Sequence, residues 1–250
     1  MLKNSNETDF YELKSVAYGR LSPTRISSFF WVSFIISGIS TLVVTVGSGS
    51  MMFISDAWLQ FIRMDIYALL IHLFIAIFFS FTKNAYKFQK LQAILLTIFS
   101  LKMSLDFYKV YFLACEDRLA PGYMWTTGFV LIGGGLIYLV LSTLRAISRV
   151  KKGAFRKGGK LLYDFQTSKG HISLSFVIGA TILGGSIIKA VSAGGNGLME
   201  VYVLLGAFAL VQYLFAMAWP EFFLIAYCKF RFDSFLKKPP TVLTDRGVKR

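Results

Sequence analysis

The chain is poor in charged residues, histidine and cysteine. Of its 250 residues only 16% are Asp, Glu, Lys or Arg, whereas 55% are hydrophobic. A soluble domain uses about 25% charged residues to cover its surface, so this composition argues against a single water-soluble core. Two histidines and two cysteines are too few for a Cys/His metal cluster or a disulfide framework. We therefore expect no metal, no cofactor and no catalytic residue, and the chain is not expected to be an enzyme.

Long apolar stretches dominate what remains. A membrane helix needs roughly 20 apolar residues to cross the hydrocarbon core. Six segments of the chain meet or approach that length, and they cover residues 26–47, 64–82, 91–114, 124–144, 172–191 and 201–227. The predicted fold is an all-α integral membrane protein, a bundle of six transmembrane helices without a soluble domain. Its predicted location is the cell membrane.

The net charge of +14 is distributed unevenly along the chain. Lys and Arg gather in the N-terminal segment 1–25, in the link before the third span, in the loop 145–170 and in the tail 228–250. The alternate links hold little positive charge, so the positive-inside rule places both termini in the cytoplasm. This pattern also requires the third span to cross, because otherwise the basic loop would lie outside. We expect the charge to meet anionic headgroups, not nucleic acid.

The third span carries three charged residues on one helical face. Lys102, Asp106 and Lys109 are spaced by four and three residues. An unpaired charge near the bilayer middle costs about 3 kcal/mol or more, so such residues point to a functional site. Asp106 can neutralise one lysine, and the other then needs water, another carboxylate or an acidic partner. An internal ion pair with Lys109 reaching toward the interface is the purely structural alternative.

Two further polar positions lie inside predicted spans. Glu221 follows Pro220, which removes a backbone donor and is expected to kink the sixth span. A carboxylate beside a kink can mark a gate or a proton site, although a pair with a lysine of the tail is also open. His72 lies midway along the second span, where it can bond another helix or relay protons.

Small residues and basic residues form the remaining candidate surfaces. Small residues allow close approach of helices, either within the bundle or between subunits. Those predicted to pack helices are Ser33, Ser37, Gly133, Gly134, Gly135, Gly179, Gly184 and Gly185. Basic residues of the loop 145–170 are expected to contact lipid headgroups or a partner. They include Arg149, Lys151, Lys152, Arg156, Lys157 and Lys160.

Two functions remain as near-equal alternatives. The first is a multi-pass subunit of a larger transport, secretion or envelope assembly, in which other membrane subunits or further copies of the chain meet the leftover charge. The second is a self-contained transporter or channel for a small solute or ion, with a path along Lys102, Asp106, Lys109, Glu221 and His72. An intramembrane enzyme is a weaker third possibility, since the chain has no paired intramembrane aspartates and no HExxH motif.

Overall fold

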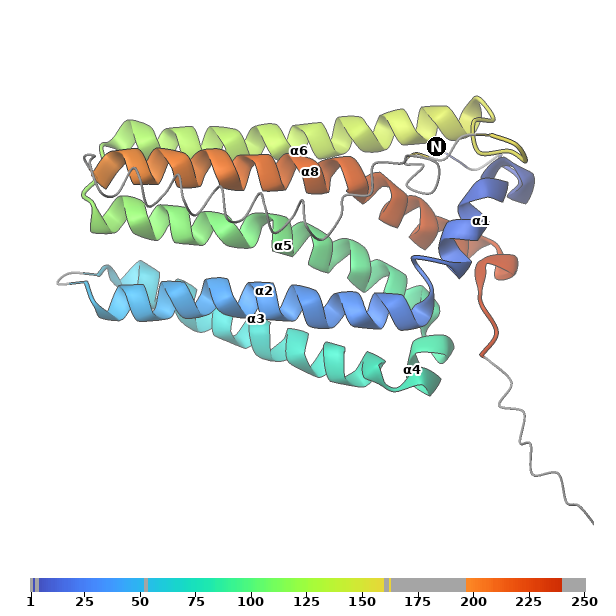
Figure 1. Cartoon of the computed structure of the whole chain (residues 1–250), viewed down its shortest axis with the longest axis horizontal. Helices are drawn as coiled ribbons and strands as arrows, with labels where there is room; N and C mark the ends of the chain where they lie inside the picture. The colour runs from blue at the N-terminus through green and yellow to red at the C-terminus, as the bar shows by residue number, and fades with distance from the viewer. Residues whose placement is uncertain (1, 3–4, 52–53, 160–161, 163–196, 240–250) are drawn as a thin grey trace, which may run out of the picture.

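The computed structural model describes residues 2, 5–51, 54–159, 162 and 197–239. Every regular element in these ranges is a helix, so the predicted all-α class is confirmed for them. The long helices run side by side, and α5 lies between the others (Figure 1). The long helices are α2 (Pro23–Gly49), α3 (Asp56–Ser80), α5 (Gln89–Asp117), α6 (Gly122–Lys151) and α8 (Gly197–Arg231).

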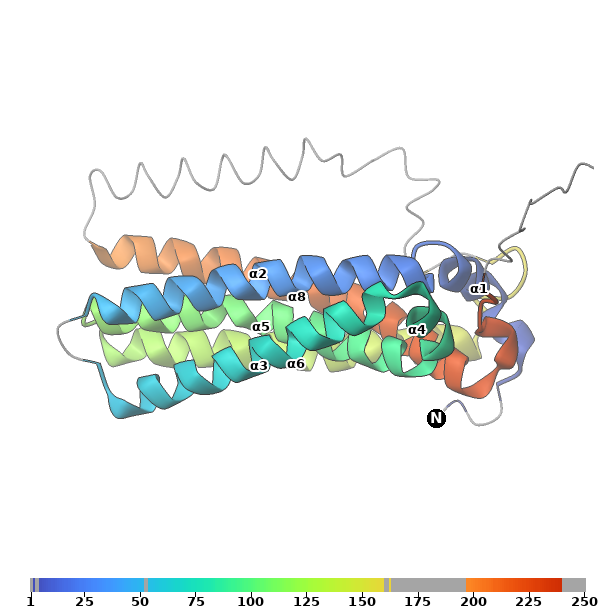
Figure 2. The same ribbon diagram turned by 90° about the horizontal axis from the view of Figure 1, so that it is seen from below.

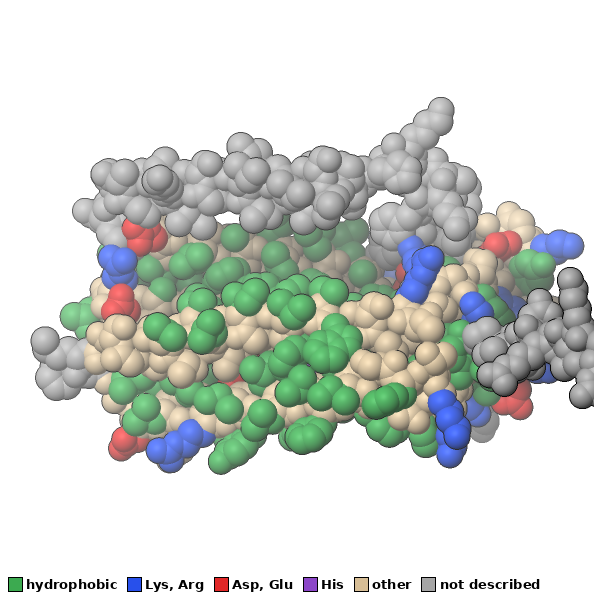
Figure 3. Space-filling model, turned by 60° about the horizontal axis from the view of Figure 1, so that its bottom comes forward, with side chains coloured by type: hydrophobic (Ala, Val, Ile, Leu, Met, Phe, Trp, Pro, Cys, Tyr) green, Lys and Arg blue, Asp and Glu red, His purple; other side chains and the backbone are tan. Residues whose placement is uncertain are grey.

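Four of these helices are long and apolar enough to cross a membrane: α2, α3, α6 and, from Leu198 to Arg231, α8. Their surfaces expose large apolar side chains such as Met64, Phe74 and Val130. Figure 3 shows apolar side chains over the length of one face, with the charged ones toward its two ends. A chain of this kind is a membrane protein. The fifth predicted span, with Gly179, Gly184 and Gly185, lies outside the described residues, so six spans and cytoplasmic termini stay predictions.

The helix α5 is the inner element of the bundle. It packs against α2, α6 and α8, and α3 packs on α2. Its length of 29 residues suffices to cross, but its charged residues give it a polar character that the other four helices lack. Neighbouring helices cover one side of α5, so Asp106 and Lys109 are buried in protein, whereas Lys102 is partly exposed. In Figure 2, α3 runs obliquely across the bundle.

Short elements close one end of the bundle, which we call the proximal end. They are η1 (Glu7–Phe10), α1 (Tyr11–Tyr18), α4 (Thr82–Lys87) and η2 (Asp233–Phe235). Phe10 and Leu13 are fully buried here, in one apolar cluster with Phe155 and Phe235. The N-terminal segment is therefore folded onto the bundle. The opposite end, which holds the α5–α6 connection at residues 118–121 and the start of α3, we call the distal end (Figure 1).

Candidate functional site

A polar stripe on α2 forms one wall of the candidate site. Ser33, Ser37 and Thr41 repeat every four residues and therefore share one face of the helix. All three side chains are buried, and this face is turned toward α3 and α5. Ser33 and Ser37, predicted as helix-packing residues, also supply hydroxyl groups to the polar groups of the neighbouring helices. A serine is small enough to let two helices approach and still offers a donor.

Lys102 and Asp106 of α5 form the first ion pair. Lys102 Nζ lies 2.7 Å from Asp106 Oδ2 and 2.8 Å from Oδ1, one helical turn away. The hydroxyl of Ser37 donates a hydrogen bond to the same carboxylate. The Lys102 side chain is 23% exposed and that of Asp106 only 8%. The carboxylate is thus held inside the bundle, while the lysine reaches its surface.

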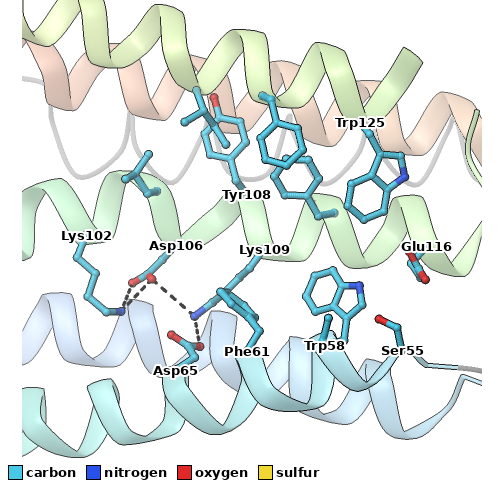
Figure 4. Close-up of a pocket in the computed structure, with 15 residues that line it drawn as sticks. Ser55, Trp58, Phe61, Asp65, Lys102, Asp106, Tyr108, Lys109, Glu116 and Trp125 are labelled. Carbon is cyan, nitrogen blue, oxygen red and sulfur yellow. Dashed lines mark hydrogen bonds and ion pairs between the residues drawn. The ribbon is translucent and has the colours of Figure 1, made fainter. Parts of the chain in front are cut away.

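Lys109 forms the second ion pair, with a residue of α3. Its Nζ lies 2.5 Å from Asp65 Oδ2 and 3.6 Å from Asp106 Oδ1, and it donates a 2.9 Å hydrogen bond to Thr41 Oγ1. Thr41 Oγ1 in turn lies 2.7 Å from Asp65 Oδ2. Figure 4 shows these two pairs meeting at Asp106. Two lysines and two aspartates from α3 and α5 make a neutral network, which we call the ion-pair cluster.

Asp65 is the site residue that sequence reasoning missed. The second span was expected to begin at Met64, which would leave Asp65 at the membrane surface. The helix begins at Asp56 instead, after the N-cap residue Ser55, so Asp65 lies more than two turns inside it. A serine followed by an aspartate is a recognisable helix start and was the available signal. The charge expected to be left over on the third span is met by this carboxylate.

His72 lies in the interior of the bundle. It is fully buried, and its ring stacks on Phe99 with 3.9 Å between the centroids. Its Nε2 lies 3.1 Å from both Ser33 Oγ and the carbonyl oxygen of Phe30, so His72 links α3 to α2 as the interhelical alternative expected. A carbonyl only accepts, which places the ring hydrogen on Nε2. Nδ1 has no hydrogen-bond partner among the described residues.

A groove leads from the ion-pair cluster to the distal end. It has a volume of about 680 Å³, its floor is α5, and its walls are α3 and α6. Lys102 and Asp106 line one end, and Glu116 and Ser55 line the other (Figure 4). Between them the lining is mostly aromatic, with Trp58, Phe61, Phe112, Trp125 and Phe129. This size is typical of a small-molecule site.

Glu221 is not part of the cluster. It lies in the proximal part of α8, is 4% exposed, and forms an ion pair with Arg20, which follows α1. The helix interior contains Pro220, and α8 bends in its C-terminal third (Figure 1). Glu221 therefore joins the N-terminal segment to α8. These contacts give Glu221 an arginine before α2 as its partner, where a lysine of the tail was expected. They do not connect Glu221 to the ion-pair cluster.

The basic residues expected to contact headgroups lie at the proximal end where the structure describes them. α6 continues to Lys151, so Arg149 and Lys151 belong to a helix and not to a loop. Arg149 lies over the ring of buried Phe155, and Arg156 is paired with Asp9 at 2.9 Å. Lys152 and Lys157 are exposed, whereas Lys160 lies outside the described residues.

The glycines of α6 differ in their surroundings. A Cβ on Gly135 would lie 2.3 Å from Gln212 Cδ, and one on Gly134 would lie 2.7 Å from Tyr213 Oη, both on α8. A Cβ on Gly133 would meet nothing within 4 Å. Two of the three glycines thus permit close approach of α6 and α8.

Comparison with known proteins adds no further information about the site. No protein-family model matches the chain, and no curated protein or solved structure is detectably similar to it. Among the described residues, no group of three or more His, Cys, Asp or Glu side chains could hold a metal ion. The ion-pair cluster and the groove are therefore the features from which we infer a function.

Proposed function

We propose that this protein is a small, self-contained transporter of the cell membrane, with the ion-pair cluster as its central site. The observation that carries the proposal is the meeting of two lysines and two aspartates in the middle of the bundle, at one end of a groove. Ionisable side chains inside a membrane are expensive and are retained mainly where a solute, ion or proton must be bound.

The arrangement of the cluster supports exchange of partners. Asp106 lies within 4 Å of both lysines, so it can hold one of them while the other turns to a solute. Lys102 is the most exposed of the four side chains and lines the groove. A solute that reaches Lys102 would compete with Asp106 for the ammonium group. The released carboxylate could be neutralised by Lys109 or by a proton.

The difference between the two ends of the bundle supports the transport proposal. At the proximal end, the buried side chains of α1 and the Arg20–Glu221 pair close the bundle. At the distal end, the groove extends to Glu116 and Ser55. A carrier exposes its central site to one side at a time. With cytoplasmic termini, as the charge pattern predicts, this conformation would face outward.

Membership of a larger assembly is the alternative proposal. One observation behind it was a positive charge on the third span that was expected to lack a partner, and Asp65 lies beside Lys109 as that partner. The exposed basic residues Lys152 and Lys157 at the proximal end still fit anionic headgroups. Association with further copies of the chain is compatible with either proposal.

The test is transport by the purified protein alone. The protein would be purified in mild detergent, its mass measured, and the protein placed in liposomes with a mixture of organic ions and neutral solutes outside. We expect a homogeneous particle without other subunits, and uptake of one solute class that Asp106→Asn reduces at least tenfold. Stoichiometric co-purification of other membrane proteins, with no uptake, would replace the transporter by the assembly subunit.

A further inference from the structure

The groove is lined by more acidic than basic side chains. Three carboxylates (Asp65, Asp106 and Glu116) and two ammonium groups (Lys102 and Lys109) line it, which leaves a net charge of −1. Both ammonium groups lie within 4 Å of an aspartate. Among the described residues, Glu116 has no cationic group within 4 Å, and its neighbour Asp117 is the residue that pairs with Arg118.

Glu116 lies far along the groove from its two lysines. Along α5 it lies about 10 Å beyond Lys109 and about 21 Å beyond Lys102, at 1.5 Å per residue. The lysines therefore lie toward one end of the groove, and Glu116 lies at its distal end, which we call the mouth. A charged group of a ligand at the mouth would lie near the negative charge of Glu116, and the rest of the ligand would lie in the apolar part of the groove.

Aromatic rings surround this mouth. Trp58 of α3 and Trp125 of α6 line the groove near Glu116, one on each wall (Figure 4). The rings are held in place by their neighbours, since Trp125 stacks on Phe112 at 5.2 Å and Trp58 packs edge-on against Phe61 at 5.6 Å. The face of an indole attracts a cation, most strongly where water is excluded.

We infer that the groove binds a lipophilic organic cation, a tertiary or quaternary onium group with an apolar body. The charge lies between Trp58, Trp125 and the Glu116 carboxylate, and the body extends along Phe112 and Phe129 toward the ion-pair cluster. An anion of the same shape is disfavoured at the mouth by Glu116. The inference rests on the proposed transport function only for its physiological meaning, because binding itself needs no transport.

The test uses two probes of one shape and opposite charge. Tetraphenylphosphonium is a lipophilic cation, and tetraphenylborate is its anionic counterpart. Binding of each to the purified full-length protein in detergent would be measured by equilibrium dialysis, with protein-free micelles as the blank. We expect saturable binding of the phosphonium and at least tenfold weaker binding of the borate. Equal or tighter binding of the borate would overturn the inference.

Matched variants locate the site. Glu116→Gln should weaken phosphonium binding at least tenfold, whereas Asp117→Asn, one residue away, should change it less than twofold. Trp58→Phe keeps an aromatic ring with a weaker cation affinity and should weaken binding several-fold, while Trp31→Phe on the distant part of α2 should not. If Glu116→Gln binds as the parent does, the groove mouth is not the cation site.

Transport is measured separately in liposomes. Binding of the phosphonium without uptake of any solute of the mixture would leave the cation site in place and overturn the transporter. Uptake of another solute by protein that does not bind the phosphonium would keep the transporter and overturn the cation site.

Discussion

The ammonium group of Lys109 lies 2.5 Å from the carboxylate of Asp65 and joins α5 to α3 through the interior of the bundle. Both side chains are almost fully buried, at 4% and 10% exposure. The attraction of such a pair only offsets the loss of hydration of its two members, but the removal of one member leaves the other charged and unpaired. The packing of α5 against α3 therefore depends on both residues of the pair.

Asp65→Ala should destabilise the protein strongly. Lys109 would keep its hydrogen bond to Thr41, but the nearest carboxylate would be Asp106 at 3.6 Å, which is already paired with Lys102. The expected loss is on the order of 3–5 kcal/mol. Asp56→Ala, at an exposed position of the same helix, is the control and should change stability by less than about 0.5 kcal/mol. Denaturant unfolding in micelles, followed by tryptophan fluorescence, measures both. The double variant Asp65→Ala/Lys109→Met should recover most of the loss.

Within α5, Asp106→Ala should be more damaging than Lys102→Met. Asp106 receives hydrogen bonds from Ser37 and Lys102 and lies near Lys109, whereas Lys102 is partly exposed in the groove. Without Asp106 one ammonium group in the membrane has no carboxylate, at a cost of about 3 kcal/mol. Folded yield and melting temperature report the difference. If the two variants were equally stable, water in the groove would be hydrating both lysines.

The charged face of α5 could be predicted from sequence, but its partners could not. Spacings of four and three residues place Lys102, Asp106 and Lys109 together on any helix, because this is a local property. The role of Asp65 depends on where α3 begins and on the angle at which it crosses α2, and hydropathy describes neither. The same limit applies to Glu221: its sequence position indicated a membrane carboxylate, but its partner Arg20 lies some 200 positions away along the chain.

The glycines of α6 provide a matched pair of substitutions. Gly135→Ala should destabilise, because Gln212 is fixed by hydrogen bonds to Tyr108 and to the Ile132 carbonyl and cannot move aside. The loss expected from such overpacking is about 1–3 kcal/mol. Gly133→Ala has free space and should be neutral or slightly stabilising, since alanine favours the helix by up to about 1 kcal/mol. Thermal unfolding of the two variants side by side measures this difference.

The N-terminal segment should become detached in acid. A hydrogen bond from the backbone N–H of Asn6, with a smaller contribution from Arg156, lowers the pKa of Asp9 below its usual value of 3.8. The hydrogen bond from Ser234 likewise lowers the pKa of Glu7. A carboxyl group with a lowered pKa stabilises the folded state above its usual pKa, and this stabilisation is lost as the pH falls toward the folded-state value.

Hydrogen exchange of residues 7–18 between pH 6 and pH 3, corrected for the intrinsic pH dependence of exchange, measures that release. We expect protection to decrease below about pH 4, the usual range of carboxyl groups. Asp9→Asn should lower protection at pH 6 and reduce its dependence on pH. Asp117→Asn at the distal end is the control and should leave the exchange of the segment unchanged. A segment equally protected at both pH values would exclude these carboxyl groups as its acid-sensitive attachment.

The ion pair between Arg20 and Glu221 is expected to hold the N-terminal segment against α8 at the proximal end. Arg20 is about one-third exposed and can turn to water, whereas the Glu221 side chain is 5% exposed and cannot. Arg20→Ala should therefore leave a buried carboxylate without its cation and destabilise by about 3 kcal/mol. Glu221→Gln removes the charge at its source and should cost less. Added to Arg20→Ala, Glu221→Gln should restore stability, because the two changes act on one interaction.

If the pair holds the N-terminal segment closed over α8, Arg20→Ala should also raise the hydrogen exchange of residues 7–18, and the double variant should lower this exchange only partly. Equal effects of the two single variants, adding without compensation, would mean that Glu221 is hydrated and that the proximal end is already open to water.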